Sequence, residues 1–165
     1  MRDRQYELTN SPEGPDLAIL LAASYRVVAD RLLAAMRAGG IEGMKPLYGY
    51  VIRAVAAEGP SINRLAELLG VTKQAASVLA DGMCDEGFLE RRTDPQDRRR
   101  ARLALSARGR AVFARATRTS AAMERELAAR VGAADVAALR RALLAFVEAH
   151  GALDDVMARR ARPVL

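Results

Sequence analysis

Aromatic side chains are scarce in this sequence, at 4% of its 165 residues, and tryptophan is absent. The hydrophobic residues, 51% of the chain, are therefore mainly aliphatic, and a core has to be built from alanine, leucine and valine. Alanine and leucine are the strongest helix formers, and this length suffices to bury the core of one domain. Composition therefore predicts a single, mainly helical unit and excludes a disordered chain.

Cysteine and histidine each occur once, as Cys84 and His150. A single cysteine excludes an intrachain disulfide and suits a reducing compartment, and we interpret Cys84 as a buried structural residue rather than an oxidant sensor. A soft metal site normally takes several Cys or His ligands. No nucleophile-and-base set, phosphate-binding glycine loop or paired carboxylates stands out. We therefore expect no metal, no cofactor and no enzymatic activity.

Long apolar runs are also missing, so the sequence offers no membrane span. Residues 1–16 are polar, carry Pro12, Gly14 and Pro15, and lack the apolar segment of a signal peptide. We expect a cytoplasmic protein with a mobile tail over residues 1–16 and no membrane association.

Basic residues outnumber acidic ones by 26 to 20, for a net charge of +6, and Lys45 and Lys73 are the only lysines. This sign of charge favours a polyanionic partner, and arginine binds phosphates and guanine edges bidentately. A GC-rich genome would also enrich arginine, so the positions of the arginines carry more weight than their number.

Hydrophobic periodicity predicts six helices and one β-hairpin. Good N-cap residues, Asp16, Ser61, Thr72 and Ser106, precede four of the helices. The turn sequence 94–97 separates the two strands. We expect helices at 17–38, 46–57, 62–69, 73–86, 107–131 and 134–149, strands at 88–93 and 100–105, and a further short helix at 153–161.

The third and fourth helices, joined at Gly70-Val71, form a helix-turn-helix pattern. In this motif the first helix crosses the DNA backbone and the second enters the major groove. The inner side of the fourth helix would carry Ala76, Leu79, Ala80 and Met83. Its outer side pairs polar groups with base edges or phosphates and offers an aliphatic contact to a thymine methyl. The candidate DNA-binding residues are Ser61, Thr72, Lys73, Gln74, Ser77 and Val78.

The predicted hairpin has a basic tip, formed by Arg98, Arg99 and Arg100. An extended positive tip can follow the phosphates or enter the minor groove. Asp94 and Asp97 would repel DNA, so we expect them to hold the turn and orient the neighbouring arginines. The alternative is that the arginine run is simply a solvated surface.

These segments resemble the MarR family of winged helix-turn-helix regulators. The resemblance spans about residues 17–149 and is sharpest over Ser61–Ser77, Gly87–Arg91, Asp94–Arg100 and Leu103–Arg110. It implies a homodimer held by the first, fifth and sixth helices, with each subunit binding half of a near-palindromic operator in double-stranded DNA. It also matches Arg99 to the family's minor-groove arginine and Asp97 to the acid beside it. The sequence departs from the family at Val78, where a polar residue is common, and at Gly82, inside the fourth helix.

The resemblance further implies repression that is relieved by a small, often aromatic, effector. Its candidate pocket residues are Tyr25, Met44, Tyr48, Tyr50 and Phe113, which could equally be ordinary core. We expect residues 17–45 and 106–165 to form a helical dimerisation region and residues 46–105 the DNA-binding lobe. Two alternatives stay open: a DNA-binding protein of the same fold without a ligand switch, and a winged helix that docks an acidic protein.

Overall fold

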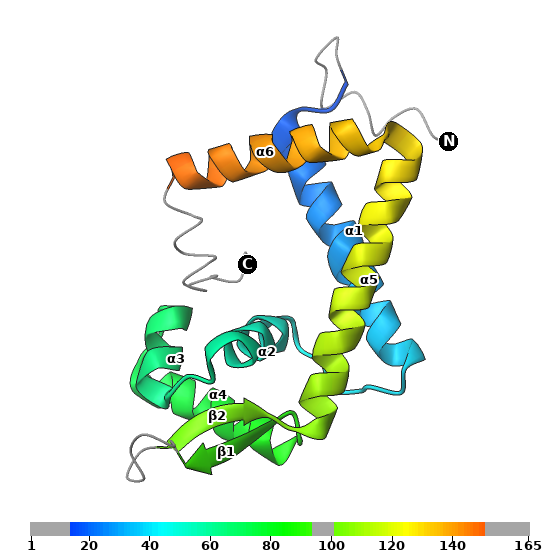
Figure 1. The fold of residues 1–165 in the computed structure, drawn as a ribbon. Coiled ribbons are helices and arrows are strands. Elements are labelled where there is room, and N and C mark those ends of the chain that lie inside the picture. The colour runs from blue at the N-terminus through cyan, green and yellow to red at the C-terminus, as the bar shows by residue number, and fades with distance from the viewer. Residues whose placement is uncertain (1–13, 94–100, 151–165) are drawn as a thin grey trace, which may run out of the picture.

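The structure, a computed structural model, describes residues 14–93 and 101–150. This part of the chain forms six helices and one two-stranded antiparallel hairpin, which lies at the end of the molecule opposite α6 (Figure 1). The predicted fold class, mainly α with a small β wing in a winged helix-turn-helix, is confirmed. The elements are α1 (Leu17–Ala38), α2 (Pro46–Glu58), α3 (Ile62–Leu69), α4 (Lys73–Asp85), β1 (Leu89–Thr93), β2 (Ala101–Leu105), α5 (Ala107–Val131) and α6 (Ala133–Ala149).

The predicted boundaries hold to within a residue. The first strand begins at Leu89 rather than at Phe88. The backbone of Phe88 closes the turn after α4 instead, because its N–H donates to the carbonyl of Met83 and its carbonyl accepts from the N–H of Ser106. Arg100 and the predicted helix at 153–161 lie outside the described residues.

Four helices begin at the predicted caps. The side chains of Asp16, Ser61, Thr72 and Ser106 each accept a hydrogen bond from the backbone N–H three residues later. Such a cap satisfies one of the N–H groups that a helix leaves unpaired at its start. At the other end of α3, Gly70 adopts a left-handed conformation with φ of 63°, which turns the chain tightly into α4.

The hydrophobic core lies in the lobe formed by α2, α3, α4 and the hairpin, as seen in the lower half of Figure 1. The N–H of Leu103 in β2 donates to the carbonyl of Pro60, which joins the hairpin to the loop between α2 and α3. The long helices contribute little: Met36 is the buried residue of α1, and Val112 is the one buried hydrophobic side chain of α5. The largest fully buried side chains are Val51, Ile52, Leu65, Leu68, Met83, Phe88, Leu103 and Val112.

The long helices form a stalk above this lobe. Helix α1 packs along α5, an ion pair between Arg31 and Glu126 joins them, and α6 crosses their far end (Figure 1). The apolar stripes predicted for α1 and α6 are present, but α6 buries none of its residues within one chain. None of the helices in the described ranges combines the length and hydropathy that a membrane span needs.

Candidate nucleic-acid interface

Helix α4 presents one side to the core and the other to solvent. Ala76, Ala80 and Met83 are completely buried, whereas the side chain of Val78 is 68% exposed. Single exposed aliphatic side chains are common on protein surfaces, and this one suits a contact with an apolar group such as a thymine methyl. The predicted division of this helix into an inner and an outer side is therefore what the structure has.

The polar residues predicted on the outer side lie together on the first two turns of α4. Thr72, Lys73 and Gln74 are exposed, and Ser77 is half-buried. The hydroxyl oxygen of Thr72 accepts from the N–H of Ala75 at 3.2 Å, so it also caps the helix. The exposed start of a helix adds unpaired N–H groups and a partial positive charge, which favour an anion.

Ser61 is set apart from that group. It is half-buried at the start of α3, and its Oγ accepts from the N–H of Arg64 at 3.3 Å. Arg64 itself pairs with Glu58 and Glu67. Ser61 thus caps α3, and a DNA contact from it would have to use the proton or the second lone pair of its hydroxyl.

The hairpin is tied to α4 by an ion pair between Arg91 of β1 and Asp81 of α4, with 2.6 Å between Nη2 and Oδ1. The hydroxyl of Ser77 donates to the other carboxylate oxygen of Asp81 at 3.3 Å. The hydrogen bond from Arg91 holds the pKa of Asp81 below its ordinary value. Sequence reasoning missed this group, although the four-residue spacing from Ser77 to Asp81 would have shown half of it.

The basic tip of the hairpin cannot be assessed in the same way. Asp94, Asp97, Arg98, Arg99 and Arg100 lie outside the described residues. The strands leading to the tip are exposed at Arg91, Arg92 and Arg102, and Arg92 pairs with Glu90 at 2.5 Å. Arg92 and Arg102 are opposite each other in the strand register. The described part of the hairpin therefore exposes arginines beside α4, with Arg91 paired to Asp81 and Arg92 paired to Glu90.

Two further groups hold the end of α4 in place. The guanidinium of Arg108, on the first turn of α5, donates to the carbonyls of Glu86 (3.1 Å) and Glu42 (2.7 Å), and it stacks over the ring of Phe88. Arg108 thereby joins three chain segments: the end of α4, the loop before α2, and the start of α5. No pattern in the sequence indicates this role.

Glu86 also takes part in the second of these groups. Its carboxylate accepts from the hydroxyl of Tyr48 at 2.7 Å and from the ammonium of Lys45 at 3.0 Å. These hydrogen bonds hold the pKa of Glu86 below its ordinary value. The ammonium of Lys45 also donates to the hydroxyl of Tyr48 at 2.9 Å, and this bond, followed by the one to Glu86, raises the pKa of Lys45. The end of α4 is therefore held to the start of α2 as well as to α5.

The five predicted pocket residues do not share one environment. Tyr48 is 3% exposed and its hydroxyl is already bonded, while Met44 and Phe113 are half-buried against the core. Tyr25 of α1 is 55% exposed and its side chain is hydrogen-bonded to that of Tyr50 of α2. Burial, followed by this bond, raises the pKa of Tyr50. Among the five, only Tyr25 and Tyr50 meet at the junction of stalk and lobe.

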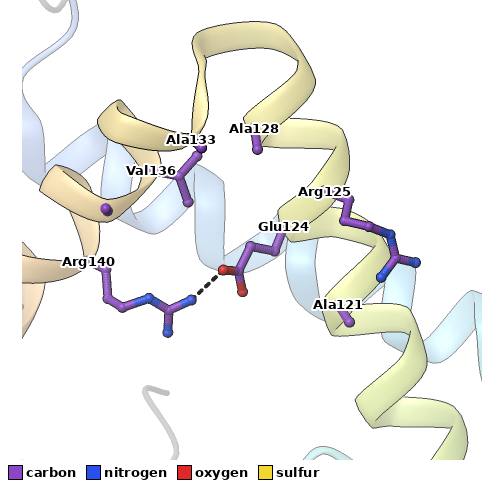
Figure 2. Close-up of a pocket in the computed structure, with 8 residues that line it drawn as sticks. Ala121, Glu124, Arg125, Ala128, Ala133, Val136 and Arg140 are labelled. Carbon is purple, nitrogen blue, oxygen red and sulfur yellow. Dashed lines mark hydrogen bonds and ion pairs between the residues drawn. The ribbon is translucent and has the colours of Figure 1, made fainter.

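Two grooves are lined by other residues, both in the stalk. The smaller, about 420 Å³, lies between the end of α5 and α6, where an ion pair between Glu124 and Arg140 crosses an alanine-rich wall (Figure 2). The larger, about 710 Å³, is mainly apolar and is lined by residues of α1, α5 and α6. Within the described ranges, no three His, Cys, Asp or Glu side chains are grouped to hold a metal ion.

Comparison with known proteins shows which family the lobe resembles. The family model of the MarR family matches residues 42–100. The chain is similar to the solved structure of RV1404 from Mycobacterium tuberculosis, at 28% identity and a TM-score of 0.64, over 81% of this chain and 90% of that one. No curated protein is significantly similar in sequence.

Two further structures were solved with DNA. FabT from Streptococcus pneumoniae, in complex with DNA, is 18% identical with a TM-score of 0.69, over 82% of this chain and 95% of that one. The MepR–DNA complex from Staphylococcus aureus is 19% identical with a TM-score of 0.61, over 81% and 96%. At these identities the two structures show a shared fold.

Proposed function

We propose that this chain, whose residues 42–100 match the family model of the MarR family and whose fold is shared with the DNA-bound FabT and MepR, binds double-stranded DNA sequence-specifically as a homodimer. The observation that carries this proposal is the exposed polar start of α4 beside the arginine-bearing hairpin. That FabT and MepR were solved with DNA supports it. Chromosomal DNA as the partner would place the protein's action in the cytoplasm.

In this proposal α4 enters the major groove with its first two turns. Gln74 bonds an adenine edge, Lys73 a guanine edge or a phosphate, and Val78 packs on a thymine methyl, which are the pairings that groove chemistry favours. Thr72 and the free N–H groups at the start of the helix bind a phosphate. Ser61, at the start of α3, is a further proposed contact, separate from those on α4.

The tip of the hairpin supplies the second contact. Arg98, Arg99 and Arg100 reach the phosphates or the minor groove, and Asp94 and Asp97 hold the turn and orient them. Support comes from the sequence resemblance and from the direction of the strands, which carry exposed arginines towards the tip. Loss of one phosphate contact should reduce the salt dependence of binding by about one unit of slope.

Homodimerisation is supported by the apolar surface that the stalk leaves uncovered in a single chain. Exposed residues include Leu17 and Leu20 of α1, Leu127 of α5, and Leu139 and Phe146 of α6. A soluble monomer rarely exposes so many large apolar side chains on adjoining elements. A second copy that covers them would place two copies of α4 on one face, so that each binds half of a near-palindromic site.

The regulatory part of the proposal is repression relieved by a small, possibly aromatic, effector. Tyr25 and Tyr50 support it, because they join the stalk to the lobe at a place where a bound molecule would change their separation. Such a molecule shifts the equilibrium only by its different affinity for the two arrangements. Met44, Tyr48 and Phe113 complete the proposed pocket by supporting it from the core side.

A second candidate is a DNA-binding protein of the same fold without a ligand switch. The buried and hydrogen-bonded state of Tyr48 favours it, as does the position of both grooves in the stalk rather than at the five pocket residues. A thermal-shift screen with aromatic acids and phenols separates the two candidates. A compound that raises the melting temperature and also lowers DNA affinity supports the switch.

The test of DNA binding is a fluorescence-anisotropy titration at several salt concentrations, using DNA selected by the protein from a random pool. Lys73→Ala and Gln74→Ala should each weaken binding to the selected sequence, and Arg99→Ala should weaken it and flatten the salt slope. Lys45→Ala is the matched control for Lys73, because it removes the only other lysine of the chain, at the start of α2 and not on α4.

Each outcome bears on the proposal. Equal losses in Lys73→Ala and Lys45→Ala would mean that net charge, and not α4, governs binding. If no sequence is selected and the protein binds no DNA even at low salt, the proposal fails. A winged helix that docks an acidic protein then becomes the better account, and co-purification of such a partner would support it.

A further inference from the structure

Three side chains link the outer side of α4 to the hairpin. Ser77 Oγ lies 3.3 Å from Asp81 Oδ2, and Arg91 Nη2 lies 2.6 Å from Asp81 Oδ1. Each carboxylate oxygen therefore has one partner, and the carboxylate is held from two sides. The side chains of Asp81 and Arg91 are 54% and 40% exposed, so the group lies at the surface.

The direction of these hydrogen bonds is fixed by chemistry. An ionised carboxylate can only accept, and a serine hydroxyl has one proton to donate. Asp81 is a surface carboxylate and is ionised at neutral pH, and the hydrogen bond from Arg91 lowers its pKa further. The single proton of Ser77 is therefore directed at Asp81, and what remains on Oγ is its lone pairs. A serine without such a neighbour could turn its proton towards DNA instead.

We propose that Asp81, held in place by Arg91, makes Ser77 a hydrogen-bond acceptor in the major groove, so that Ser77 selects a base with an exocyclic amino group. In that groove adenine and cytosine offer an amino donor, whereas guanine and thymine offer oxygen acceptors there. Asp81 is thus a positioning residue that acts on specificity through Ser77. This inference rests on the proposed entry of α4 into the major groove, and it goes beyond it by fixing the class of base at one position.

The same geometry explains how an acid is tolerated on this side of the helix. A bare carboxylate close to phosphates would weaken binding, and Arg91 supplies the compensating charge from the adjoining strand. Asp85, one turn later on α4, is also exposed, and the described contacts give it no hydrogen bond to Ser77 or ion pair with Arg91. Asp85 therefore provides a matched control for the removal of an acidic group from α4.

The experiment is selection of DNA from a random pool by the wild type and by Ser77→Ala, Asp81→Ala and Asp85→Ala. Anisotropy titrations on the wild-type sequence and its single-base variants follow. We expect one position in each half-site at which the wild type requires adenine or cytosine. At that position, replacing adenine by purine, or cytosine by a base without the amino group, should weaken wild-type binding about three- to tenfold, as loss of one hydrogen bond does.

The variants separate the roles. Ser77→Ala should lose the preference at that position and should bind the amino-free DNA as well as the natural sequence. Asp81→Ala should relax the preference, so that it binds the natural and the amino-free DNA with similar affinity, because the freed hydroxyl can then donate or accept. Asp85→Ala should keep the preference. Circular dichroism and melting curves confirm that each variant is folded.

Other results would overturn the inference. If Ser77→Ala keeps the preference while Asp81→Ala loses it, the carboxylate reads the base directly. If both variants keep the base preference, neither residue sets it. If Asp81→Ala and Asp85→Ala both abolish the preference, the charge of the helix sets it and the contact with Ser77 does not. A sequence selected by the wild type but insensitive to these variants refutes the inference alone. A wild type that selects no sequence refutes the proposed function and this inference together.

Discussion

Replacing glycine by alanine should have opposite effects at two helical positions of this chain. At Gly109, on the first turn of α5, a Cβ would lie 2.1 Å from the carbonyl oxygen of Phe88 and 3.4 Å from the Cβ of Leu105. At Gly82, inside α4, no atom outside the helix backbone lies within 4 Å of such a Cβ. The first substitution requires the backbone to move, whereas the second fills open space.

The magnitudes follow from these distances. A contact of 2.1 Å has to open by about 1 Å, and overpacking of this kind costs about 1–3 kcal/mol. The obstructing oxygen also accepts hydrogen bonds from the backbone N–H and hydroxyl of Ser106, and weakening them adds about 1 kcal/mol. Gly109→Ala should therefore lower the free energy of unfolding by about 2–4 kcal/mol. Gly82→Ala should raise it by about 0.5–1 kcal/mol, the difference in helix propensity.

The assay is urea unfolding followed by circular dichroism, with all proteins at one concentration, because the stability of a dimer depends on concentration. Comparing Gly109→Ala with Gly82→Ala removes any general effect of adding a methyl group. A Gly109→Ala variant as stable as the wild type would refute the packing argument. A destabilised Gly82→Ala variant would mean that the space beside Gly82 is filled, for example by a second subunit.

Three further predictions concern the joint between lobe and stalk and the stalk itself. Arg108→Ala should lower the unfolding free energy by about 1–2 kcal/mol in urea, because two carbonyls and a ring lose their partner, and Arg108→Lys should recover part of it. Glu86→Gln should lower the melting temperature more at pH 7 than at pH 3. A tyrosine hydroxyl and a lysine lower the pKa of this carboxyl in the folded state. The ionised carboxylate therefore stabilises the fold above the pKa of the unfolded state, about 4.3, and this contribution is lost as pH falls through the lower pKa of the folded state. An equal loss of melting temperature at both pH values would contradict this. Leu139 lines the apolar groove of the stalk, and Leu139→Glu should halve the mass of the proposed dimer measured by light scattering. Ala145→Glu, at an exposed position outside that groove, should leave the mass unchanged. A Leu139→Glu variant that is still dimeric would place the interface elsewhere.

The sequence by itself determined the order and the ends of the elements. Helix starts depend on a local interaction between a cap side chain and a backbone N–H three residues on, so Asp16, Ser61, Thr72 and Ser106 could be found without a structure. The inner and outer sides of α4 followed from its period for the same reason. The segment Leu103–Arg110, which contains Gly109, was visible as a resemblance to a known family, although the packing reason for the glycine was not.

The tertiary structure decided which residues from distant segments meet. Arg91 and Asp81 are ten residues apart, and Arg108 reaches the carbonyl of Glu42 across 66 positions, distances at which no local period applies. It also decided that the apolar stripes of α1 and α6 stay uncovered in one chain, whereas those of α3 and α4 are buried. A stripe shows that a helix has an apolar face, but only packing determines whether its own chain or another molecule covers that face.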